Sequence, residues 1–525
     1  MATATPGSRR RTWLGWVYRA CAGRYESGWS FTLMGAALFA LVLVFGHLHH
    51  EMWRDELQCW SMGRASHGLW DLLTGERRYE GHPFLWYYVL YLVSRLSSSF
   101  VTLHFVTVAL VVTAAGLWLR YAPLPRILRV LLLGSYYLVY EYGVISRTYA
   151  LGLLLTFWFC ALYHPRRIRY VPSAILLSLL AATSMYGMLM AVALGVFLFS
   201  HGPSFRRPDD SDARARVVFP VGWMIGFGLY LLSLALTVIT TIPPADDMYS
   251  PGPALPITGT VLRDIAARYW QVMFPFHTLT SWNWLQADWL GSGWSFGPWL
   301  IPWLGVLWFG VWIVVLRRSP RAVVTYGLGV VAMMLFQHFI YSGGLRHLGN
   351  CFILLLACVW LHARETRGRF PDRVLHALLA TNLVLQCLTG FAALRTDSRE
   401  IFSGSEEAAS FIREHHLLGL PVVGDPDAPT SAVASTLDQP FFYPETGETA
   451  EAIVWHSRRS SVSREQVLEH ARRLARSADG TALIVLNYDL APGPTPGLTS
   501  TLVFRGKPAI LVDESFRIYQ VKVAK

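Results

Sequence analysis

Residues 31–50 read FTLMGAALFALVLVFGHLHH, and the polar segment EMWRDELQ of residues 51–58 follows at once. A helix that crosses a bilayer needs about 20 mostly apolar residues, which this first run supplies. The segment before the run is basic, and no small-residue cleavage site follows it, so the pattern predicts an uncleaved first span rather than a signal peptide. Residues 1–30 are therefore expected in the cytoplasm.

The composition of the whole chain agrees with a membrane protein. Of its 525 residues, 53% are hydrophobic and only 15% are charged, and the mean hydropathy is +0.36. Soluble domains usually carry about a quarter charged residues. The net charge of +11 comes largely from arginines in short loops between apolar runs. That distribution is typical of cytoplasmic loops and argues against a nucleic-acid partner.

Further apolar runs continue to residue 394, and the charge of the loops decides how many of them cross. Both ends of the long run 171–201 are basic, so this run is expected to cross twice, with a turn at Ser184–Gly187. The other basic connectors, expected in the cytoplasm, are 120–129, 317–321 and 362–373. About eleven spans result: 31–50, 100–119, 128–144, 148–164, two within 171–201, 218–242, 298–316, 322–342, 350–363 and 374–394.

The aromatic run 82–95 is the ambiguous segment. Only an odd number of crossings fits between the outward end of the first span and the basic connector 120–129, so the run is expected to lie in the interface or to re-enter. Twelve spans is the alternative, but it would bring Glu141 and Arg147 to the cytoplasm. In the eleven-span arrangement the outward regions are 51–99, 141–148, 184–187, 243–297, 343–349 and the tail after about 395.

The tail, residues 395–525, changes character. Polar helical patterns alternate with strand-like runs, which is typical of a small α/β domain. We therefore expect an all-α polytopic membrane domain over 31–394 and a soluble extracytoplasmic α/β domain over 395–525. The expected helices of the tail are 406–416 and 464–477, and the expected strands are 421–425, 481–490, 500–506 and 516–523.

Three carboxylates in the outward loops are candidates for chemistry. Asp55 and Glu56 stand a few residues beyond the first span, among aromatic residues, in a segment (52–72) that is expected to be an interfacial helix. A carboxylate in reduced dielectric can serve as a base or a metal ligand. Glu141 lies in a very short loop, six residues before Arg147. Ionisable groups at such depth are costly, and the alternative is that these two pair only to hold the loop.

Four cationic or imidazole side chains are candidates for binding a phosphate. Arg147 follows Glu141, while Arg346 and His347 follow two glycines at a helix end. Arginine suits phosphate because its guanidinium offers several donors in one plane. His82 opens the aromatic run 82–95. Each has a plain alternative, since an interfacial arginine can extend to lipid headgroups and a histidine can belong to a turn.

The long outward loop 243–297 carries Asp246, Asp247 and a tryptophan cluster. Tryptophans at this depth more often form an interface belt than a platform for a sugar ring. The six cysteines are scattered, without a CxxC or Cys/His cluster, so neither disulfides nor a thiolate metal site is expected. The tryptophans of the cluster are Trp270, Trp282, Trp284, Trp289 and Trp294.

Three short motifs give the chain a resemblance. They are WRDELQ (53–58), EGHPFLWYYVLYL (80–92) and SRTYAL (146–151). With these motifs the chain resembles the GT-C glycosyltransferases, in particular the branch of the protein O-mannosyltransferases and the bacterial aminoarabinose transferase of lipid A. The resemblance covers roughly residues 30–200, and beyond that only the architecture matches.

The resemblance implies a hexosyl or pentosyl transferase in the bacterial cell membrane that takes its sugar from a polyprenyl-phosphate donor with inversion. Asp55 matches the family's first-loop acid, which serves as base or metal neighbour, and Glu141 stands for the second-loop acid, with Arg147 beside it. Arg346 has the place of a cation that grips the donor phosphate. A divalent metal stays open, because some relatives have paired acids where Glu141 stands alone.

The acceptor could be a lipid-linked glycan, an exopolysaccharide, a lipid or a protein, and a bacterial envelope glycan is favoured because the tail resembles a small envelope domain. No WWD-type motif of the oligosaccharyltransferases is present, so transfer to asparagine is not expected. Two other classes of function fit the composition. A transporter or flippase of a lipid-linked saccharide would carry a chain of ionisable groups inside its spans. A non-catalytic assembly or receptor protein would need none of the loop acids.

Overall fold

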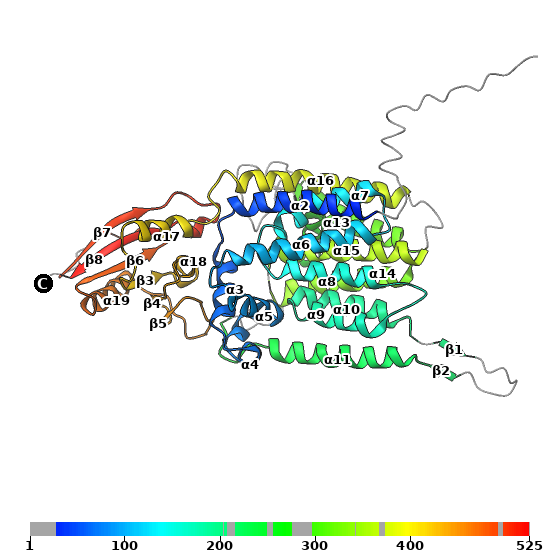
Figure 1. Cartoon of the computed structure of the whole chain (residues 1–525), viewed down its shortest axis with the longest axis horizontal. Coiled ribbons are helices and arrows are strands. Elements are labelled where there is room, and N and C mark those ends of the chain that lie inside the picture. Colours follow the sequence, from blue (N-terminus) through cyan, green and yellow to red (C-terminus); the bar gives the residue numbers. More distant parts are fainter. Residues whose placement is uncertain are drawn as a thin grey trace, which may run out of the picture.

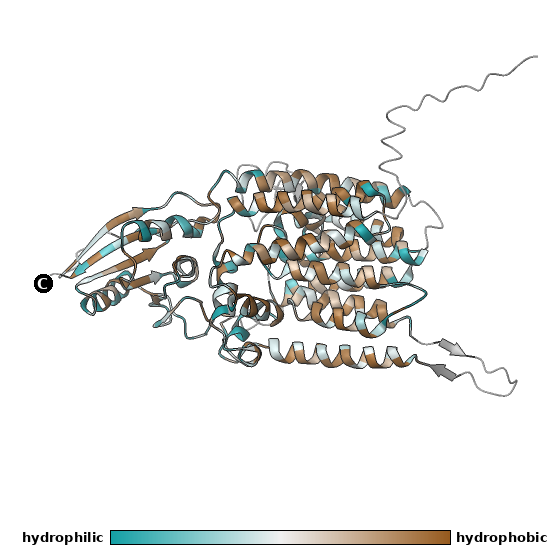
Figure 2. Cartoon of the chain, in the orientation of Figure 1, coloured by the Kyte–Doolittle hydropathy of each residue, from teal (hydrophilic) through white to brown (hydrophobic). Residues whose placement is uncertain are grey.

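The computed structural model describes residues 28–202, 204–206, 216–248, 256–275, 297–341, 343–366, 373–491 and 497–523. A bundle of helices makes up most of the molecule, and a smaller domain of strands and helices sits at one end of it (Figure 1). The bundle helices are mainly hydrophobic along their length (Figure 2). Among the described residues, seven helices are long and apolar enough to cross a membrane: α2 (Trp29–His49), α6 (Thr102–Tyr121), α11 (Val221–Thr241), α13 (Gly297–Leu316), α14 (Pro320–Phe339), α15 (Leu345–Thr366) and α16 (Arg373–Asp397).

Shorter helices occupy the other runs that were expected to span. The run 171–201 forms two helices, as predicted, and the second begins where Ser184 Oγ accepts a hydrogen bond from the Gly187 N–H at 2.9 Å. The run 128–144 is broken, because α7 ends at Gly134 and a π-helical turn, η2, follows. The bounds are α7 (Arg126–Leu133), η2 (Tyr137–Glu141), α8 (Tyr149–Leu162), α9 (Tyr170–Ala181) and α10 (Met185–Phe199).

Residues 51–99 fold into short helices at the end of the bundle that carries the C-terminal domain (Figure 1). The interfacial helix expected over 52–72 is interrupted at Gly68, whose φ of +145° suits glycine alone. Gly81, at φ +61°, makes the second turn, into the aromatic run. That run forms α5, whose ten residues are too few to span a bilayer. The elements are α3 (Arg54–Ala65), α4 (Leu69–Thr74), η1 (Glu76–Glu80) and α5 (Leu85–Ser94).

Helix α12 (Gly259–Met273) was not predicted, because arginines interrupt its apolar face. It runs beside α13 in the same direction: Arg263 lies over the Trp299 ring at 4.3 Å, and the ring of Phe274 lies 5.0 Å from that of Trp308. Four tryptophans of the predicted cluster, Trp282, Trp284, Trp289 and Trp294, lie outside the described residues.

Polar side chains of neighbouring helices satisfy the C-terminal carbonyls of α12. The Tyr137 hydroxyl donates to Val272 O at 2.9 Å, and Asn382 Nδ2 donates to Met273 O at 2.7 Å. Gln386 Nε2 reaches the same Met273 oxygen at 3.3 Å. The last carbonyls of a helix have no partner within it, and an apolar bundle offers no water to replace one. This explains why Asn382 and Gln386 are fully buried in α16.

The C-terminal domain holds a mixed six-stranded sheet in the order β5-β4-β3-β6-β8-β7, in which β3 is parallel to both β4 and β6. The α/β domain and its four expected strands are confirmed, whereas β4, β5 and the helix α18 were not predicted. Helices α17 and α18 cover one face of the sheet and α19 covers the other. The bounds are α17 (Ser405–Glu414), β3 (Val422–Asp425), α18 (Asp427–Leu437), β4 (Phe441–Tyr443), β5 (Glu448–Ala450), α19 (Arg464–Arg476), β6 (Thr481–Leu486), β7 (Leu498–Arg505), η3 (Val512–Glu514) and β8 (Arg517–Val523). A separate hairpin, β1 (Ser204–Arg206) with β2 (Arg216–Val218), lies at the opposite end of the bundle (Figure 1).

The C-terminal domain docks on α3 through paired polar groups. The Gln58 side chain bonds both backbone groups of Ile453, donating to its oxygen at 2.6 Å and accepting from its N–H at 2.9 Å. The hydroxyls of Ser61 and Ser435 meet at 2.9 Å. Because α3 also packs against α5 at Gly63, it is held between the bundle and the C-terminal domain.

Candidate active site

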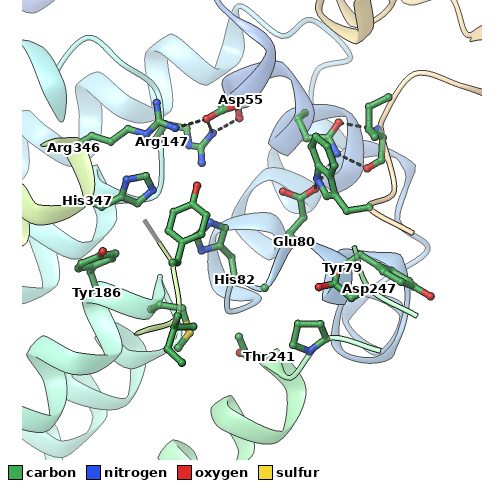
Figure 3. Close-up of a pocket in the computed structure, with 18 of the residues that line it drawn as sticks. Asp55, Tyr79, Glu80, His82, Arg147, Tyr186, Thr241, Asp247, Arg346 and His347 are labelled. Carbon is green, nitrogen blue, oxygen red and sulfur yellow. Dashed lines mark hydrogen bonds and ion pairs between the residues drawn. The ribbon is translucent and has the colours of Figure 1, made fainter. Parts of the chain in front are cut away.

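A cavity of about 490 Å³ lies where the bundle meets the C-terminal domain. This volume falls in the range of small-molecule sites. Its walls come from α3, η1, the first turns of α10 and α15, the last turns of α11 and α14, and the C-terminal domain at 428–431 and 453–455. Figure 3 shows the ionisable side chains that face it. The charged and imidazole side chains among them include Asp55, Glu80, His82, Arg147, Arg346 and His347.

Asp55 and two arginines form the charged centre of this cavity. Arg346 Nη2 donates to Asp55 Oδ2 at 2.7 Å, and Arg147 Nη1 lies 3.1 Å from the same oxygen. Arg147 Nη1 also donates to the Asp55 backbone oxygen at 2.6 Å. The three residues stand at the starts of α3, α8 and α15, so three helix N-termini meet here. Such ends carry partial positive charge and favour an anion.

The ion pairs set the charge state of Asp55. Burial alone would raise the pKa of the carboxyl, but Arg346, Arg147 and Arg54 outweigh it and hold this pKa below its ordinary value. Asp55 is therefore ionised at neutral pH. Arg346 also lies over the Trp53 ring at 4.7 Å, which fixes the plane of its guanidinium.

Both arginines keep donors that a ligand can use. Arg147 Nε and Arg346 Nε are buried and have no hydrogen-bond partner among the described residues. Leaving a buried N–H without a partner is costly, so these two donors favour a ligand that can accept hydrogen bonds. An anion with several oxygens, such as a phosphate, suits these donors in charge and geometry.

His82 and His347, the two histidines proposed from sequence, line the same cavity. Burial, and then Arg147, lower the pKa of His82 to about 4, so its ring is neutral at neutral pH. The Nδ1 atoms of both rings lack a partner among the described residues. A neutral ring still offers one N–H donor, but it adds no charge to the site.

Glu56 does not line the cavity, although it was predicted as a catalytic residue next to Asp55. Its Oε2 is 3.0 Å from His50 Nε2, and its Oε1 accepts the Ser146 N–H at 2.5 Å. His50 Nδ1 in turn bonds Asp397 at 2.9 Å. Glu56 thus ties together α3, the end of α2, the end of α16 and the turn that carries Arg147.

Glu141 lies apart from the cavity as well. It is 1% exposed in the π-helical turn η2, where the Tyr136 hydroxyl donates to its Oε2. Its Oε1 has no partner among the described residues. The structure therefore brings Asp55, Arg147, Arg346, His82 and His347 to one cavity but leaves Glu56 and Glu141 outside it.

Glu80 is the cavity residue that was not singled out by sequence. It ends η1 and opens the EGHPF stretch. Gln58 Nε2 and Trp455 Nε1 donate to its Oε1 at 2.9 and 3.0 Å. Only its place beside His82 in that stretch could have signalled it. Trp455 carried no signal, because it lies 375 residues further along the chain.

The acidic pair of the long outward loop faces the C-terminal domain. Asp247 lines the cavity and forms an isolated β-bridge with His456. Asp246 accepts a hydrogen bond from the Tyr79 hydroxyl at 2.7 Å. Trp270 packs on Phe274, with ring centroids 4.3 Å apart, and does not line the cavity.

A metal site is not formed by the side chains described. Among these residues no group of three or more His, Cys, Asp and Glu side chains could hold an ion. The carboxylate of Asp55 is already paired with the guanidinium groups of Arg147 and Arg346. The residues present do not fit the divalent metal that the sequence left open, and no step below uses one.

Comparison with known proteins adds evidence on the fold. No family model and no curated protein matches the chain. Among solved structures it is similar to the glycosyltransferase ArnT from Cupriavidus metallidurans, at 12% identity over 92% of this chain and 97% of ArnT, with a TM-score of 0.50. The chain has an ArnT-like fold.

The chain is also similar to the arabinofuranosyltransferase AftD from Mycobacteria, at 14% identity over 95% of this chain, with a TM-score of 0.41. A second structure of that protein, the R1389S mutant in class 2, gives 13% identity and a TM-score of 0.40. The chain spans about two fifths of the length of AftD, with 40% covered. Because the match to ArnT spans nearly both chains, the GT-C architecture expected from the motifs is confirmed at the level of the fold.

Proposed function

We propose that the protein is a membrane glycosyltransferase that moves a sugar from a polyprenyl-phosphate donor to a hydroxyl of an envelope acceptor on the extracytoplasmic face. The observation that carries the proposal is the convergence of Asp55, Arg147 and Arg346 on one cavity at the end of the bundle, below the C-terminal domain. The ArnT-like fold and the motif resemblance support it. A bacterial envelope glycan is the acceptor that we favour.

Arg147 and Arg346 would bind the donor phosphate. Their unpartnered Nε–H groups and the helix N-termini behind them give the cavity one strongly cationic end. Negative charge grows on the phosphate as the bond from the sugar to the phosphate oxygen breaks. Donors fixed in place before the reaction stabilise that charge most, since nothing has to reorganise. His82 and His347 would add neutral N–H donors beside them.

Asp55 would hold the two arginines ready for the donor. The sequence predicted it as the base, but its Oδ2 atom receives both guanidinium groups, and its lowered pKa makes it a weak proton acceptor. A carboxylate in this position keeps two like charges close together until the phosphate arrives. Its contacts therefore favour a role in arranging the phosphate site.

The proposal is tested by transfer from a panel of polyprenyl-phosphate sugars. Purified protein in detergent is given each donor with a radiolabelled sugar and an envelope glycan extract, and both labelled product and free polyprenyl phosphate are measured. We expect one donor to be consumed, and we expect Arg346→Ala and Arg147→Ala to lose transfer by about a hundredfold or more. If no donor of the panel is consumed by the unmodified protein, the proposal fails.

The alternative of a transporter or flippase predicts ionisable groups through the middle of the spans. In the described spanning helices, the Asp, Glu, Lys, Arg and His side chains all lie within five residues of a helix end, as with His104 in α6 and His362 in α15. That placement favours chemistry at one face over passage through the bundle.

A further inference from the structure

Glu80 is held in a different way from Asp55, the other carboxylate beside the two arginines. Both of its hydrogen bonds from the described residues go to one oxygen, Oε1, from Gln58 at 2.9 Å and from Trp455 at 3.0 Å. The other oxygen, Oε2, has no partner among these residues. Both donors are neutral, so they orient the carboxylate without cancelling its charge. Glu80 thus presents one fixed, unsatisfied oxygen to a cavity.

The two donors come from different domains. Gln58 belongs to α3, and the same side chain bonds both backbone groups of Ile453 in the C-terminal domain. Trp455 belongs to the C-terminal domain itself. Its ring lies 4.5 Å from the Arg459 guanidinium, which also bonds Glu445 at 2.9 Å. Arg459 therefore holds the indole that donates to Glu80, and the position of this indole depends on the docking of the C-terminal domain.

Glu80 and Asp55 face the same cavity in opposite electrostatic settings. Asp55 is paired with arginines, whereas Glu80 meets the amide and the indole. Burial raises the pKa of Glu80, although Arg147 pulls it down. Two carboxylates whose environments separate their pKa values in this way are usually given different tasks. A base works best when its pKa approaches the working pH.

Other titratable groups act on Glu80 less directly. Arg77 interacts with it from η1, and Asp55 adds a like charge. Cys59 and Tyr87 also interact electrostatically with Glu80. Burial raises the pKa of the Cys59 thiol to about 11 and that of the Tyr87 hydroxyl well above its ordinary value. Both are neutral at neutral pH, so Arg147 and Asp55 are the charged groups within the cavity that act on it.

We propose that Glu80 is the base of the transfer reaction, and that the C-terminal domain completes the acceptor side of the site by holding Glu80 through Trp455. The inference rests on the proposed function. Figure 3 shows the division: Arg346, Arg147 and His347 gather on one side, and Glu80, Tyr79 and Asp247 on the other. The donor phosphate takes the cationic side. An acceptor hydroxyl lies at Glu80 Oε2, on the side of the cavity where Trp455 of the C-terminal domain contacts Glu80.

The step balances with these groups alone. Glu80 Oε2 takes the proton of the acceptor hydroxyl, and the acceptor oxygen forms a bond to the anomeric carbon of the sugar. The bond between that carbon and the phosphate oxygen breaks with its electron pair, so polyprenyl phosphate leaves with the added negative charge beside Arg147 and Arg346. Glu80 then returns its proton to water. Attack from the side opposite the phosphate gives inversion.

The first test replaces the carboxylate while keeping its shape. Glu80→Gln should lower kcat by about 10²–10⁴-fold, the usual contribution of a general base. Binding of farnesyl phosphate, a probe of the phosphate side, should not change. In Glu80→Ala, added formate should restore part of the rate in proportion to its concentration. A purely structural role for Glu80 would give no rescue.

The second test addresses the C-terminal domain. Trp455→Phe keeps an aromatic ring but removes the N–H that reaches Glu80. We expect kcat to fall by about tenfold with little change in the donor KM, in line with one lost hydrogen bond to a charged group. The acid limb of the pH profile should move to higher pH, because the carboxylate loses a donor that favours its ionised form. Asp438→Asn is the matched control, since Asp438 pairs with Arg64 in the same domain contact but does not line the cavity.

Three outcomes decide the inference. An unmodified protein that consumes no polyprenyl-phosphate sugar removes the proposed function and the inference with it. An active protein whose Glu80→Gln variant transfers at the unmodified rate overturns the inference and leaves the proposed function standing. Loss of transfer in Glu80→Gln with farnesyl phosphate binding retained, formate rescue in Glu80→Ala, and a shifted acid limb in Trp455→Phe support it.

Discussion

Arg54 and Glu514 face each other across the junction of the two domains, with Arg54 Nη1 3.7 Å from Glu514 Oε1. The backbone N–H of Arg54 donates to the same oxygen at 3.3 Å. Because Arg54 directly precedes Asp55, the first turn of α3 that presents Asp55 to the arginines is fastened to the C-terminal domain. The position of Asp55 therefore depends on the contact between α3 and the C-terminal domain.

Glu514 should make this contact weaker as the pH rises from acid to neutral and slightly above. Burial raises the pKa of Glu514 from 4.5 to about 8, even though Arg54 and Ser403 favour its ionised form and only Asp513 adds a like charge. A carboxyl with a raised folded pKa contributes stability that is complete below its unfolded pKa and lost as pH rises through its folded pKa. The melting temperature should therefore fall as pH rises from 4.5 to about 8. Glu514→Gln should flatten that fall, and the exposed Glu448→Gln should not.

Arg346 should matter more for the donor than for the fold. Arg346→Ala should raise the donor KM and lower kcat/KM by about a hundredfold or more, because the leaving phosphate loses a charged donor. Arg346→Lys should recover only part of this, since an ammonium lacks the planar set of donors. Arg399→Ala, an exposed change at the same end of the bundle, serves as the control. Equal donor KM values in all four proteins would refute the phosphate role.

Glu56 should behave as a structural residue. Glu56→Gln leaves the buried His50 without one of its two carboxylate partners, a change that costs about 3–5 kcal/mol in comparable buried pairs. The yield of folded protein and its melting temperature should fall, while the rate per folded molecule stays within about threefold of the unmodified enzyme. A stable Glu56→Gln protein without activity would instead restore Glu56 to the chemistry.

The anchoring of α12 can be tested in α16. Asn382→Leu together with Gln386→Leu removes both side chains that donate to Met273 O. Leaving a buried carbonyl unsatisfied costs about 1–3 kcal/mol, so the end of α12 should open more often. Hydrogen exchange at residues 259–273 should rise, with little change in α9 and α10. Unchanged exchange in α12 would mean that the two side chains do not hold it.

The sidedness on which the proposed function depends can be mapped with single added cysteines. Glu448→Cys, exposed in β5, should react with a membrane-impermeant maleimide in intact cells. Arg167→Cys, exposed in the connector 164–170, should react only after the membrane is opened. A chain with Cys21→Ala and Cys387→Ala gives the background, because the other four cysteines, Cys59, Cys160, Cys351 and Cys358, are buried. The reverse pattern would place the cavity in the cytoplasm.

The elements that could be predicted from sequence are those that depend on the residues of their own segment. Apolar length and the position of arginines predicted the helices of the bundle, including two helices within 171–201; the turn between them was expected at 184–187 and lies at 182–184. Helix α12 escaped because Arg263 and Arg268 interrupt its hydrophobicity, and what seats it in the bundle are donors from Tyr137 and Asn382, both more than 100 residues away. Tertiary hydrogen bonds of that kind leave no periodic trace in the chain.

The same distinction applies to the site. Asp55, Arg147 and Arg346 were found because charges beside spans are conspicuous. The prediction had no means of separating Asp55 from its neighbour Glu56, since consecutive helical residues point about 100° apart and only packing decides which one meets the cavity. Glu80 was hidden in a loop rich in charged residues. Its proposed role depends on the hydrogen bond from Trp455, and the local sequence does not predict that these two residues are close in space.

The bonds between Gln58 and Ile453 join residues 395 positions apart, and this has a consequence for synthesis. At about 5–20 residues per second, a ribosome needs roughly 20–80 s to travel between them. During that interval α3 has already left the ribosome, yet the surface that covers it does not exist. The cavity therefore stays incomplete until the C-terminal domain has been made and has folded onto α3, so the candidate site is not assembled while that domain is still being synthesised.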